Sequence, residues 1–215
     1  MTLRRSFAHG TLWRVFPWDQ AAPEGAPHSP RSVAPARFQN YGRFDLQGNP
    51  LVLYLAETPA HAVAEVLRGR MRDPVRDPRL RHVLVDGDLV RGNFRLALVD
   101  VRVPTSVADR LPDTSEGGTL ERFGIRADQL SSTVRSVTQD AARRIHEHPD
   151  AVPGFVWWSR FGGDWHVVLL FLDRVSLDEL DLGTPEPLRL DHPAVLEAAA
   201  ILHLDLESSA DRTAK

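Results

Sequence analysis

The chain has 215 residues, of which 42% are hydrophobic and 26% charged, enough apolar material for one core with an ordinary soluble surface. The 26 Lys and Arg are outnumbered by 29 Asp and Glu, which argues against a broad nucleic-acid surface. There are no cysteines, which excludes disulfides and thiolate chemistry. The longest apolar run, Val167 to Leu172, is too short for a bilayer. With no signal peptide recognised, we expect a cytoplasmic protein without membrane contact.

A short strand and a long proline-rich loop are predicted first. The sequence Leu-Trp-Arg-Val-Phe favours a strand over Leu12–Phe16. Residues 17–36 follow, with prolines at 17, 23, 27, 30 and 35 that fix φ and remove backbone donors. A loop of this length inside a domain is either a functional lid or a surface insertion, and the sequence leaves both readings open.

A buried strand and a capped helix are predicted next. The apolar segment Leu51–Ala56 favours the strand. Thr58 can cap a helix whose first residue is Pro59, a favoured first position, and the helix should stop near Gly69.

The rest of the chain mixes strands with helices. The predicted strands are His82–Val90, Arg95–Val103, Gly154–Trp158 and His166–Leu172, and the predicted helices are Ala127–His148 and Pro193–Leu204. Turns at 92–93 and 161–164 would join these strands in pairs. The mixture predicts an α+β fold with one domain over 1–205, which contains the 17–36 loop, and a polar tail over 206–215.

Several familiar motifs are absent from the sequence. There is no G-x-G-x-x-G after a strand, no G-x-x-x-x-G-K-[ST] and no G-x-S-x-G, which removes the Rossmann, P-loop and nucleophile-elbow readings. His146 and His148 stand two positions apart near a helix end. That spacing does not place them on one helix face, so no metal site is predicted there.

The segment Tyr41-Gly42-Arg43-Phe44-Asp45 is the first of three candidate sites. A glycine beside an arginine lets the backbone approach a ligand closely while the guanidinium grips an anion. The alternative is a turn with a solvent-facing Arg43.

Tyr54 and Glu65 form the second candidate site. Tyr54, at the end of the buried strand, could line a pocket with an aromatic body and a polar tip. At 100° per residue, His61, Glu65 and Arg68 share a flank of the next helix beside its apolar stripe. The alternative for Glu65 is an exposed carboxylate paired with Arg68.

The third candidate site is the segment Trp157-Trp158-Ser159-Arg160-Phe161-Gly162-Gly163. Adjacent tryptophans on a strand point to opposite faces, so one would be core and the other partly exposed. Ser159 at the strand end could orient a ligand, and the alternative is a plain strand-to-turn hydrogen bond.

In their order and spacing, these features resemble the RES domain family, named for its Arg, Glu and Ser. The matching segments are Trp13-Arg14-Val15, Gly42-Arg43-Phe44, Gly48-Asn49-Pro50, Tyr54-Leu55-Ala56, Ala62 to Leu67, and Gly154 to Ser159 followed by the apolar strand Val167–Leu172. Where the family commonly shows Gly-Gly-Arg-Trp-Asn, this chain has Tyr41-Gly42-Arg43-Phe44-Asp45. The aspartate adds a negative charge beside the arginine that would bind an anion.

The resemblance implies a fold like the ADP-ribosyltransferase-type core, with a bent or split sheet and flanking helices. It implies the toxin of a toxin–antitoxin pair, an enzyme that degrades NAD by cleaving the nicotinamide–ribose bond through hydrolysis or phosphorolysis. NAD is then the substrate, and no cofactor or metal is expected. The expected partner is an antitoxin with an Xre-type helix-turn-helix domain, and no direct nucleic-acid contact is expected.

The resemblance also assigns roles to five residues. Glu65 would stabilise the positive charge that develops on the ribose. Arg14 and Arg43 would hold the pyrophosphate. Tyr54 would stack on the nicotinamide or its ribose, and Ser159 would hydrogen-bond the nicotinamide ribose or amide.

Two other functions stay open at this point. The same site could transfer ADP-ribose to a protein target. Alternatively, the chain could be a non-catalytic partner-binding module, which the departure at Phe44-Asp45 would favour.

Overall fold

The elements of the fold come from a computed structural model, which describes residues 10–35, 39, 41–46, 50–68, 83–159 and 165–207. The strands are β1 (Leu12–Trp18), β2 (Val52–Ala56), β3 (Val83–Val85), β4 (Val90–Arg91), β5 (Phe94–Arg102), β6 (Gly154–Trp158), β7 (His166–Phe171), β8 (Asp181–Leu182), β9 (Glu186–Pro187) and β10 (Asp205–Glu207). The α-helices are α1 (Pro59–Arg68), α2 (Thr105–Ala108), α3 (Gly117–Arg122), α4 (Ala127–Ser131), α5 (Arg135–Glu147) and α6 (Pro193–Ile201). Two 3₁₀ helices are η3 (Asp86–Leu89) and η4 (Leu177–Glu179).

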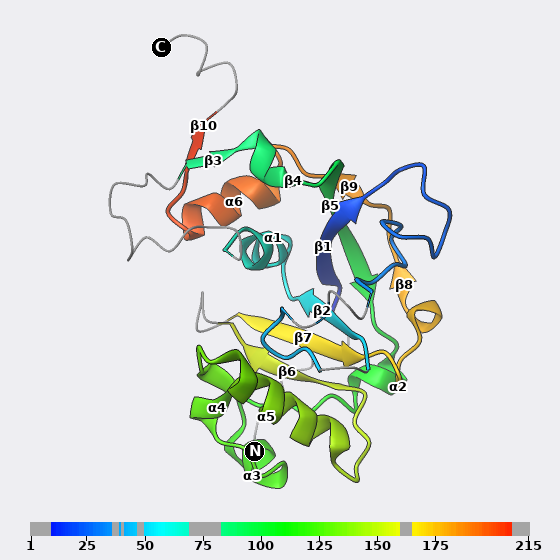
Figure 1. The fold of residues 1–215 in the computed structure, drawn as a ribbon, viewed down its shortest axis with the longest axis vertical. Helices are drawn as coiled ribbons and strands as arrows, with labels where there is room; N and C mark the ends of the chain where they lie inside the picture. The colour runs from blue at the N-terminus through cyan, green and yellow to red at the C-terminus, as the bar shows by residue number, and fades with distance from the viewer. Residues whose placement is uncertain are drawn as a thin grey trace.

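An antiparallel sheet with the strand order β4-β5-β1-β2-β7-β6 forms the centre, and β8 and β9 also pair with β5. All seven residues of β1 pair with β5, and all five of β2 pair with β7. By contrast, β1 and β2 share one register pair, Trp13↔Ala56. We call this junction between β1 and β2, at the pair Trp13↔Ala56, the seam. The sheet turns sharply there, so β1 and β5 cross the direction of β2, β7 and β6 (Figure 1). The predicted bent or split sheet and the α+β class are confirmed.

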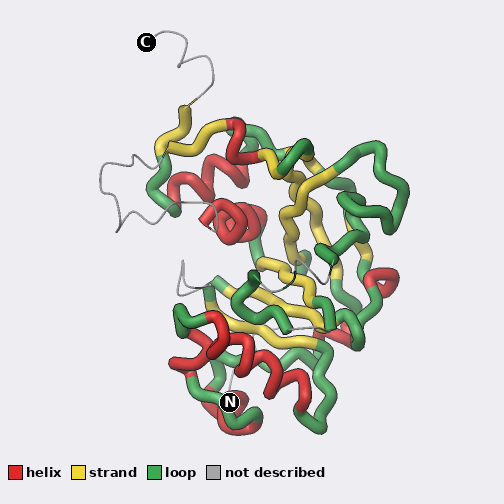
Figure 2. Tube along the Cα trace, viewed as in Figure 1, coloured by secondary structure: helices red, strands yellow, loops and turns green. Residues whose placement is uncertain are grey.

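Helices cover the sheet in two groups, which are drawn above and below β2, β7 and β6 in the view of Figure 2. Apolar residues of α1 and α6 pack in one core cluster with residues of β1 and β5. Residues of α4 and α5 pack in a second cluster with residues of β6 and β7. The junction between the two groups therefore lies at the seam.

The two sides of the sheet can be told apart along β2. Val52 and Tyr54 face the core under α4 and α5. Leu53 and Leu55 face the opposite side, where they join a third core cluster with residues of β1, β5 and β7. This alternation, which follows from the two-residue period of a strand, decides below which candidate residues can meet.

Most of the predicted strands and the predicted helix cap are confirmed. The strands expected over Leu12–Phe16, Leu51–Ala56, Gly154–Trp158 and His166–Leu172 are present within two residues at each end. Thr58 Oγ1 accepts a hydrogen bond from the His61 backbone N–H at 3.1 Å, which caps α1. The turn predicted at 161–164 lies outside the described residues.

The single helix predicted over Ala127–His148 is wrong, because the chain forms α4 and α5 with a break at residues 132–134. Ser132 leaves the helical region (ψ 141°), and its hydroxyl accepts a hydrogen bond from the Val134 N–H at 3.0 Å. Serine and threonine hydroxyls compete in this way with helical hydrogen bonds.

The strand predicted over His82–Val90 is also interrupted. Asp88 Oδ2 accepts a hydrogen bond from the Val85 N–H at 3.0 Å, and the chain turns through η3 before β4. The helix predicted over Pro193–Leu204 ends earlier, at Ile201, and the chain then turns at His203 (φ 55°). Strand β10 pairs in parallel with β3, so the first two residues of the predicted 206–215 tail are in a strand.

Within the described ranges, no helix has both the length and the apolar character needed to cross a bilayer.

Candidate active site at the seam

Glu65 and Ser159 meet at the seam, although 94 positions separate them in the chain. Glu65 lies on α1, and Ser159 directly follows β6. The Ser159 hydroxyl donates a hydrogen bond to Glu65 Oε1 at 2.7 Å. The Glu65 side chain is 35% exposed, whereas Ser159 is buried. The alternative partner of Glu65, the side chain of Arg68, lies outside the described residues.

A tight turn around Gly42 holds Tyr54 beside the first candidate segment. The Tyr54 hydroxyl donates to Asp45 Oδ1 at 2.6 Å and accepts from the Phe44 N–H at 3.2 Å. The other oxygen of Asp45 accepts from the Gly42 N–H at 2.7 Å. A Cβ at Gly42 would lie 2.3 Å from Asp45 Oδ1 and 2.6 Å from the Tyr54 hydroxyl oxygen, so this position accepts only glycine without rearrangement.

Burial and the negative charge of Asp45 raise the pKa of the Tyr54 phenol well above its ordinary value. The hydrogen bond to that carboxylate acts in the same direction. The phenol is therefore a proton donor over the whole physiological range, and its donation to Asp45 persists. Asp45, which in the sequence was a departure from the family pattern, is a buried acceptor that closes the turn.

Arg43 is tied to the same turn. Its guanidinium donates to the Leu130 carbonyl at the end of α4 and lies 5.2 Å from the ring centroid of Phe44. Its positive charge acts to lower the pKa of the Tyr54 phenol, against the larger effects that raise it. The Arg43 carbonyl accepts a hydrogen bond from Thr138 of α5. The alternative of a solvent-facing turn arginine is thus wrong, because the side chain is partly buried and bonded.

Trp157 connects the two parts of the site. Its ring lies edge-to-face with Tyr54, with centroids 6.0 Å apart. It also packs against Phe44 in the core under α4 and α5. Because residues two apart on a strand share a face, Trp157 and Ser159 lie on the same side of the sheet. Tyr54 thus contacts Trp157, and Ser159, two residues further along the chain on the same side, contacts Glu65.

Arg14 is not brought together with these residues. It lies on β1 with Leu12 and Phe16 on its face, the side of the sheet opposite to Tyr54. Its guanidinium donates to the carbonyls of Pro30, at 2.9 Å, and of Ser32. Burial lowers the pKa of Arg14 to about 10, so it stays charged at neutral pH. Arg14 therefore binds the described part of the proline-rich loop through two of its carbonyls.

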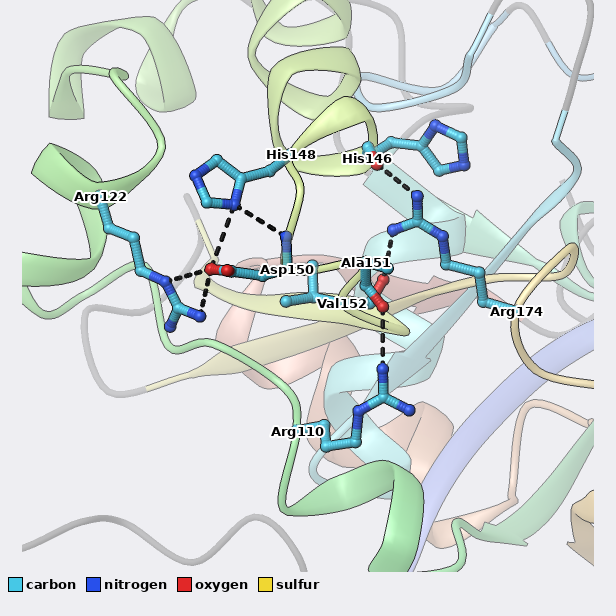
Figure 3. Close-up of polar contacts among 8 residues, drawn as sticks. All are labelled: Arg110, Arg122, His146, His148, Asp150, Ala151, Val152 and Arg174. Atoms are coloured by element: carbon cyan, nitrogen blue, oxygen red, sulfur yellow. Dashed lines mark hydrogen bonds and ion pairs between the residues drawn. The ribbon is translucent and has the colours of Figure 1, made fainter.

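The histidines at the end of α5 point apart and have separate partners, as their spacing predicts. His146 Nε2 lies 2.9 Å from Asp173 Oδ2, and His148 Nδ1 lies 3.1 Å from Asp150 Oδ2. The turn between α5 and β6 is held by three arginine side chains, Arg110, Arg122 and Arg174 (Figure 3). This cluster secures the start of β6, and in the described part of the chain no group of three or more metal-ligating side chains is found.

Two cavities lie away from the seam. One of about 690 Å³ is lined by residues of the proline-rich loop and of 172–179. The other, of about 220 Å³, lies beside Arg110 and Asp150. Neither is lined by Glu65, Ser159 or Tyr54. The candidate site is placed at the seam because the Ser159 hydroxyl and the Glu65 carboxylate, which come from distant segments, meet there.

Reasoning from sequence missed Asp45 as a structural acceptor and gave no role to His61 or Trp165. His61 lies four residues before Glu65, a spacing that places the two side chains one helical turn apart and could have identified the pair. Trp165 lies outside every matched segment, so only the fold reveals its contact with His61.

The fold and the site define a single α+β domain whose polar residues converge where a bent sheet changes direction. A family model described as the RES domain matches residues 11–191, so the chain belongs to the RES domain family. Its fold is similar to a chain in the crystal structure of the M. tuberculosis MbcT–MbcA toxin–antitoxin complex (TM-score 0.54, 17% identity). That alignment covers 87% of this chain and 86% of the other. The curated proteins gave no match.

Proposed function

We propose that this protein is the toxin of a toxin–antitoxin pair and degrades NAD by cleaving its nicotinamide–ribose bond. The observation that carries the proposal is the Glu65 carboxylate, partly exposed and held by Ser159 at the seam. Both residues fall on the motif positions that the family resemblance assigns to chemistry. The fold neighbour, whose title names a toxin–antitoxin complex, supports the toxin role.

In the proposed reaction, the bond between the ribose carbon and the nicotinamide nitrogen breaks, and both electrons go to nicotinamide, which leaves as a neutral molecule. The ribosyl centre becomes oxocarbenium-like, as in glycoside cleavage. Water then adds and loses a proton to give ADP-ribose, or phosphate adds to give the 1″-phosphate. NAD is consumed as a substrate, and the proposal needs no cofactor and no metal.

Each residue of the site has a place in this scheme. Glu65 stabilises the developing positive charge on the ribose. Arg43 brings a guanidinium for the pyrophosphate, and Tyr54, with its ring orientation fixed by Asp45, contacts the nicotinamide or its ribose. Ser159 orients Glu65 and can accept a hydrogen bond from a ribose hydroxyl. Arg14 is left out of this scheme because it lies on the side of the sheet opposite to Tyr54.

Replacing Glu65 with glutamine tests the proposal. The variant should keep the fold and lose about 10²–10³ in rate, since one electrostatic contact to a developing charge is worth roughly 3–4 kcal/mol. Glu186→Gln is a matched control, because Glu186 also lies 3.3 Å from a histidine Nε2, that of His192, but is 72% exposed on β9. Nicotinamide release by the purified proteins, with and without phosphate, is the measurement. Similar rates for both variants would rule out the assignment of Glu65.

Transfer of ADP-ribose to a protein uses the same site and differs in the acceptor. Labelled NAD separates the two activities, because transfer leaves the label on protein and hydrolysis leaves it in free ADP-ribose. The non-catalytic reading rested on Phe44 and Asp45. The first packs in the core and the second closes the Gly42 turn, so this departure no longer favours that reading.

The proposal extends to the control of the toxin. A cytoplasmic enzyme that consumes NAD needs restraint, and an antitoxin with a helix-turn-helix domain is the partner that we propose. Expression of this chain alone should stop growth and lower cellular NAD, and co-expression with the neighbouring gene's product should restore both. Unchanged growth and NAD in cells that contain the soluble, folded protein would contradict the toxin role.

A further inference from the structure

His61 is a fully buried residue of α1 that lies one helical turn before Glu65. Its ring packs against Trp165, with centroids 4.5 Å apart and an angle of 36° between the planes. Histidine is only an average helix former, and burial of a polar ring among apolar residues is unfavourable unless it is hydrogen-bonded. The position therefore needs a reason other than packing.

The contact between His61 and Glu65 supplies that reason. His61 Nε2 lies 3.3 Å from Glu65 Oε1, the oxygen that also accepts the hydrogen bond from Ser159. Oε1 thus faces two side chains, one from its own helix and one from the end of β6. No described residue hydrogen-bonds to Oε2, which is therefore the oxygen left for a ligand.

The surroundings of the other ring nitrogen decide the protonation state of His61. Nδ1 is buried and has no hydrogen-bond partner among the described residues. An imidazolium would place an N–H at Nδ1, and a buried donor without an acceptor is costly. The neutral ring with its hydrogen on Nε2 avoids that cost, and this tautomer can donate to the Glu65 carboxylate.

We propose that His61 is a positioning residue for Glu65: as the neutral Nε2–H tautomer, it joins Ser159 in holding Oε1, so that Oε2 meets the ribosyl centre. The inference rests on the proposed NAD cleavage. A glutamate side chain has three torsions, and two donors on one oxygen restrict them before substrate arrives. His61 itself does not touch the substrate.

Two substitutions separate positioning from packing. His61→Gln keeps a side-chain N–H donor, whereas His61→Leu fills the site without one. We expect His61→Leu to lose about 10–100-fold in kcat, the range for residues that orient a functional group, with KM within about threefold. His61→Gln should stay within about threefold of the unchanged protein in both constants. Equal losses in both variants, or unchanged kcat in a folded His61→Leu protein, would overturn the proposal.

A spectroscopic measurement gives a result that does not depend on NAD cleavage. Long-range ¹H–¹⁵N correlation spectra distinguish the two neutral tautomers from the imidazolium, and the His61→Gln spectrum identifies the His61 signals among the nine histidines. We expect the Nε2–H tautomer at pH 7.5. An Nδ1–H tautomer or an imidazolium would refute the positioning role. If the unsubstituted protein shows the Nε2–H tautomer but does not cleave NAD, the proposed function is refuted. The hydrogen bond between His61 and Glu65 would still stand in that case.

Discussion

Replacing Gly42 with alanine tests how the turn at 42–45 holds Tyr54 and Arg43. The added Cβ would lie 2.3 Å from Asp45 Oδ1 and 2.6 Å from the Tyr54 hydroxyl oxygen, both closer than real Cβ contacts. The backbone N–H of Gly42 and the hydroxyl of Tyr54 both donate to the Asp45 carboxylate, at 2.7 and 2.6 Å. The carboxylate must therefore move, and at least one of these bonds must break.

The magnitude follows from the number of bonds at risk. A hydrogen bond to a charged group contributes about 1.5–3 kcal/mol. Loss of one bond, or of both with partial recovery from water, should lower the free energy of unfolding by about 2–4 kcal/mol. The same turn positions Arg43 and Tyr54, so kcat/KM for NAD should also fall. This fall should be seen without denaturant, where the variant remains folded.

Urea denaturation followed by circular dichroism measures the loss of stability. Gly118→Ala is the control, because Gly118 is an exposed position in α3 with no atom within 4 Å of an added Cβ. Alanine in a helix should leave that variant unchanged or stabilise it by up to about 1 kcal/mol. If the two alanine variants unfold at the same urea concentration as the unchanged protein, the carboxylate does not hold the turn in the way described.

Three further predictions concern the arginines and the phenol. Arg43→Ala should weaken NAD binding more than Arg43→Lys, with both impaired, because lysine keeps the charge but loses the bidentate fork; equal and unchanged affinities in calorimetry would make Arg43 a turn residue only. Arg14→Met should lower the free energy of unfolding by about 2 kcal/mol through lost bonds to Pro30 and Ser32, and expose the loop to proteolysis. Its kcat/KM for NAD should stay normal in the folded protein, and a selective loss of NAD affinity would return Arg14 to the site. Since the pKa of Tyr54 is raised in the folded state, its phenol contributes stability below the ordinary tyrosine pKa of about 10, and that contribution is lost as the pH rises toward the folded-state pKa. Tyrosinate absorbance near pH 10–11 should therefore be the same for the folded protein and for Tyr54→Phe, and a larger signal in the unchanged protein would contradict the raised pKa.

Local signals predicted the parts of the fold that depend on a few neighbouring residues. Thr58 and Pro59 mark the start of α1 because capping and a proline at the first position act within one turn. The break after Ser131 was missed because a serine can either continue a helix or bond to the backbone, and the choice depends on packing around α4 and α5. The 3₁₀ turn at Asp88 was missed because an aspartate side chain can also bond to the backbone, as Asp88 does to the Val85 N–H.

The residues of the candidate site also differ in how far the sequence could predict them. Glu65 and Ser159 could be associated only through the ordered family pattern, because no local rule links residues 94 positions apart. Arg14 matched that pattern as well, yet it lies on the other side of the sheet. Strand alternation places Arg14 and Trp13 on opposite faces, but a sequence does not say which face meets α1. Trp13 packs against the core cluster that contains the apolar residues of α1, so Arg14 lies on the face away from α1.

The single pair Trp13↔Ala56 also has a consequence for the energetics of local opening. Backbone hydrogen bonds are dense within β1–β5 and within β2–β7–β6 but sparse between them, so the two halves are candidates for separate cooperative units. Glu65 is carried by α1, which packs with the first half, whereas Tyr54, Trp157 and Ser159 belong to the second. A molecule that contacts both Glu65 and Tyr54 would thus stabilise the association of the two units. Its binding would slow amide exchange at the ends of both halves nearest the seam, even at residues that it does not touch.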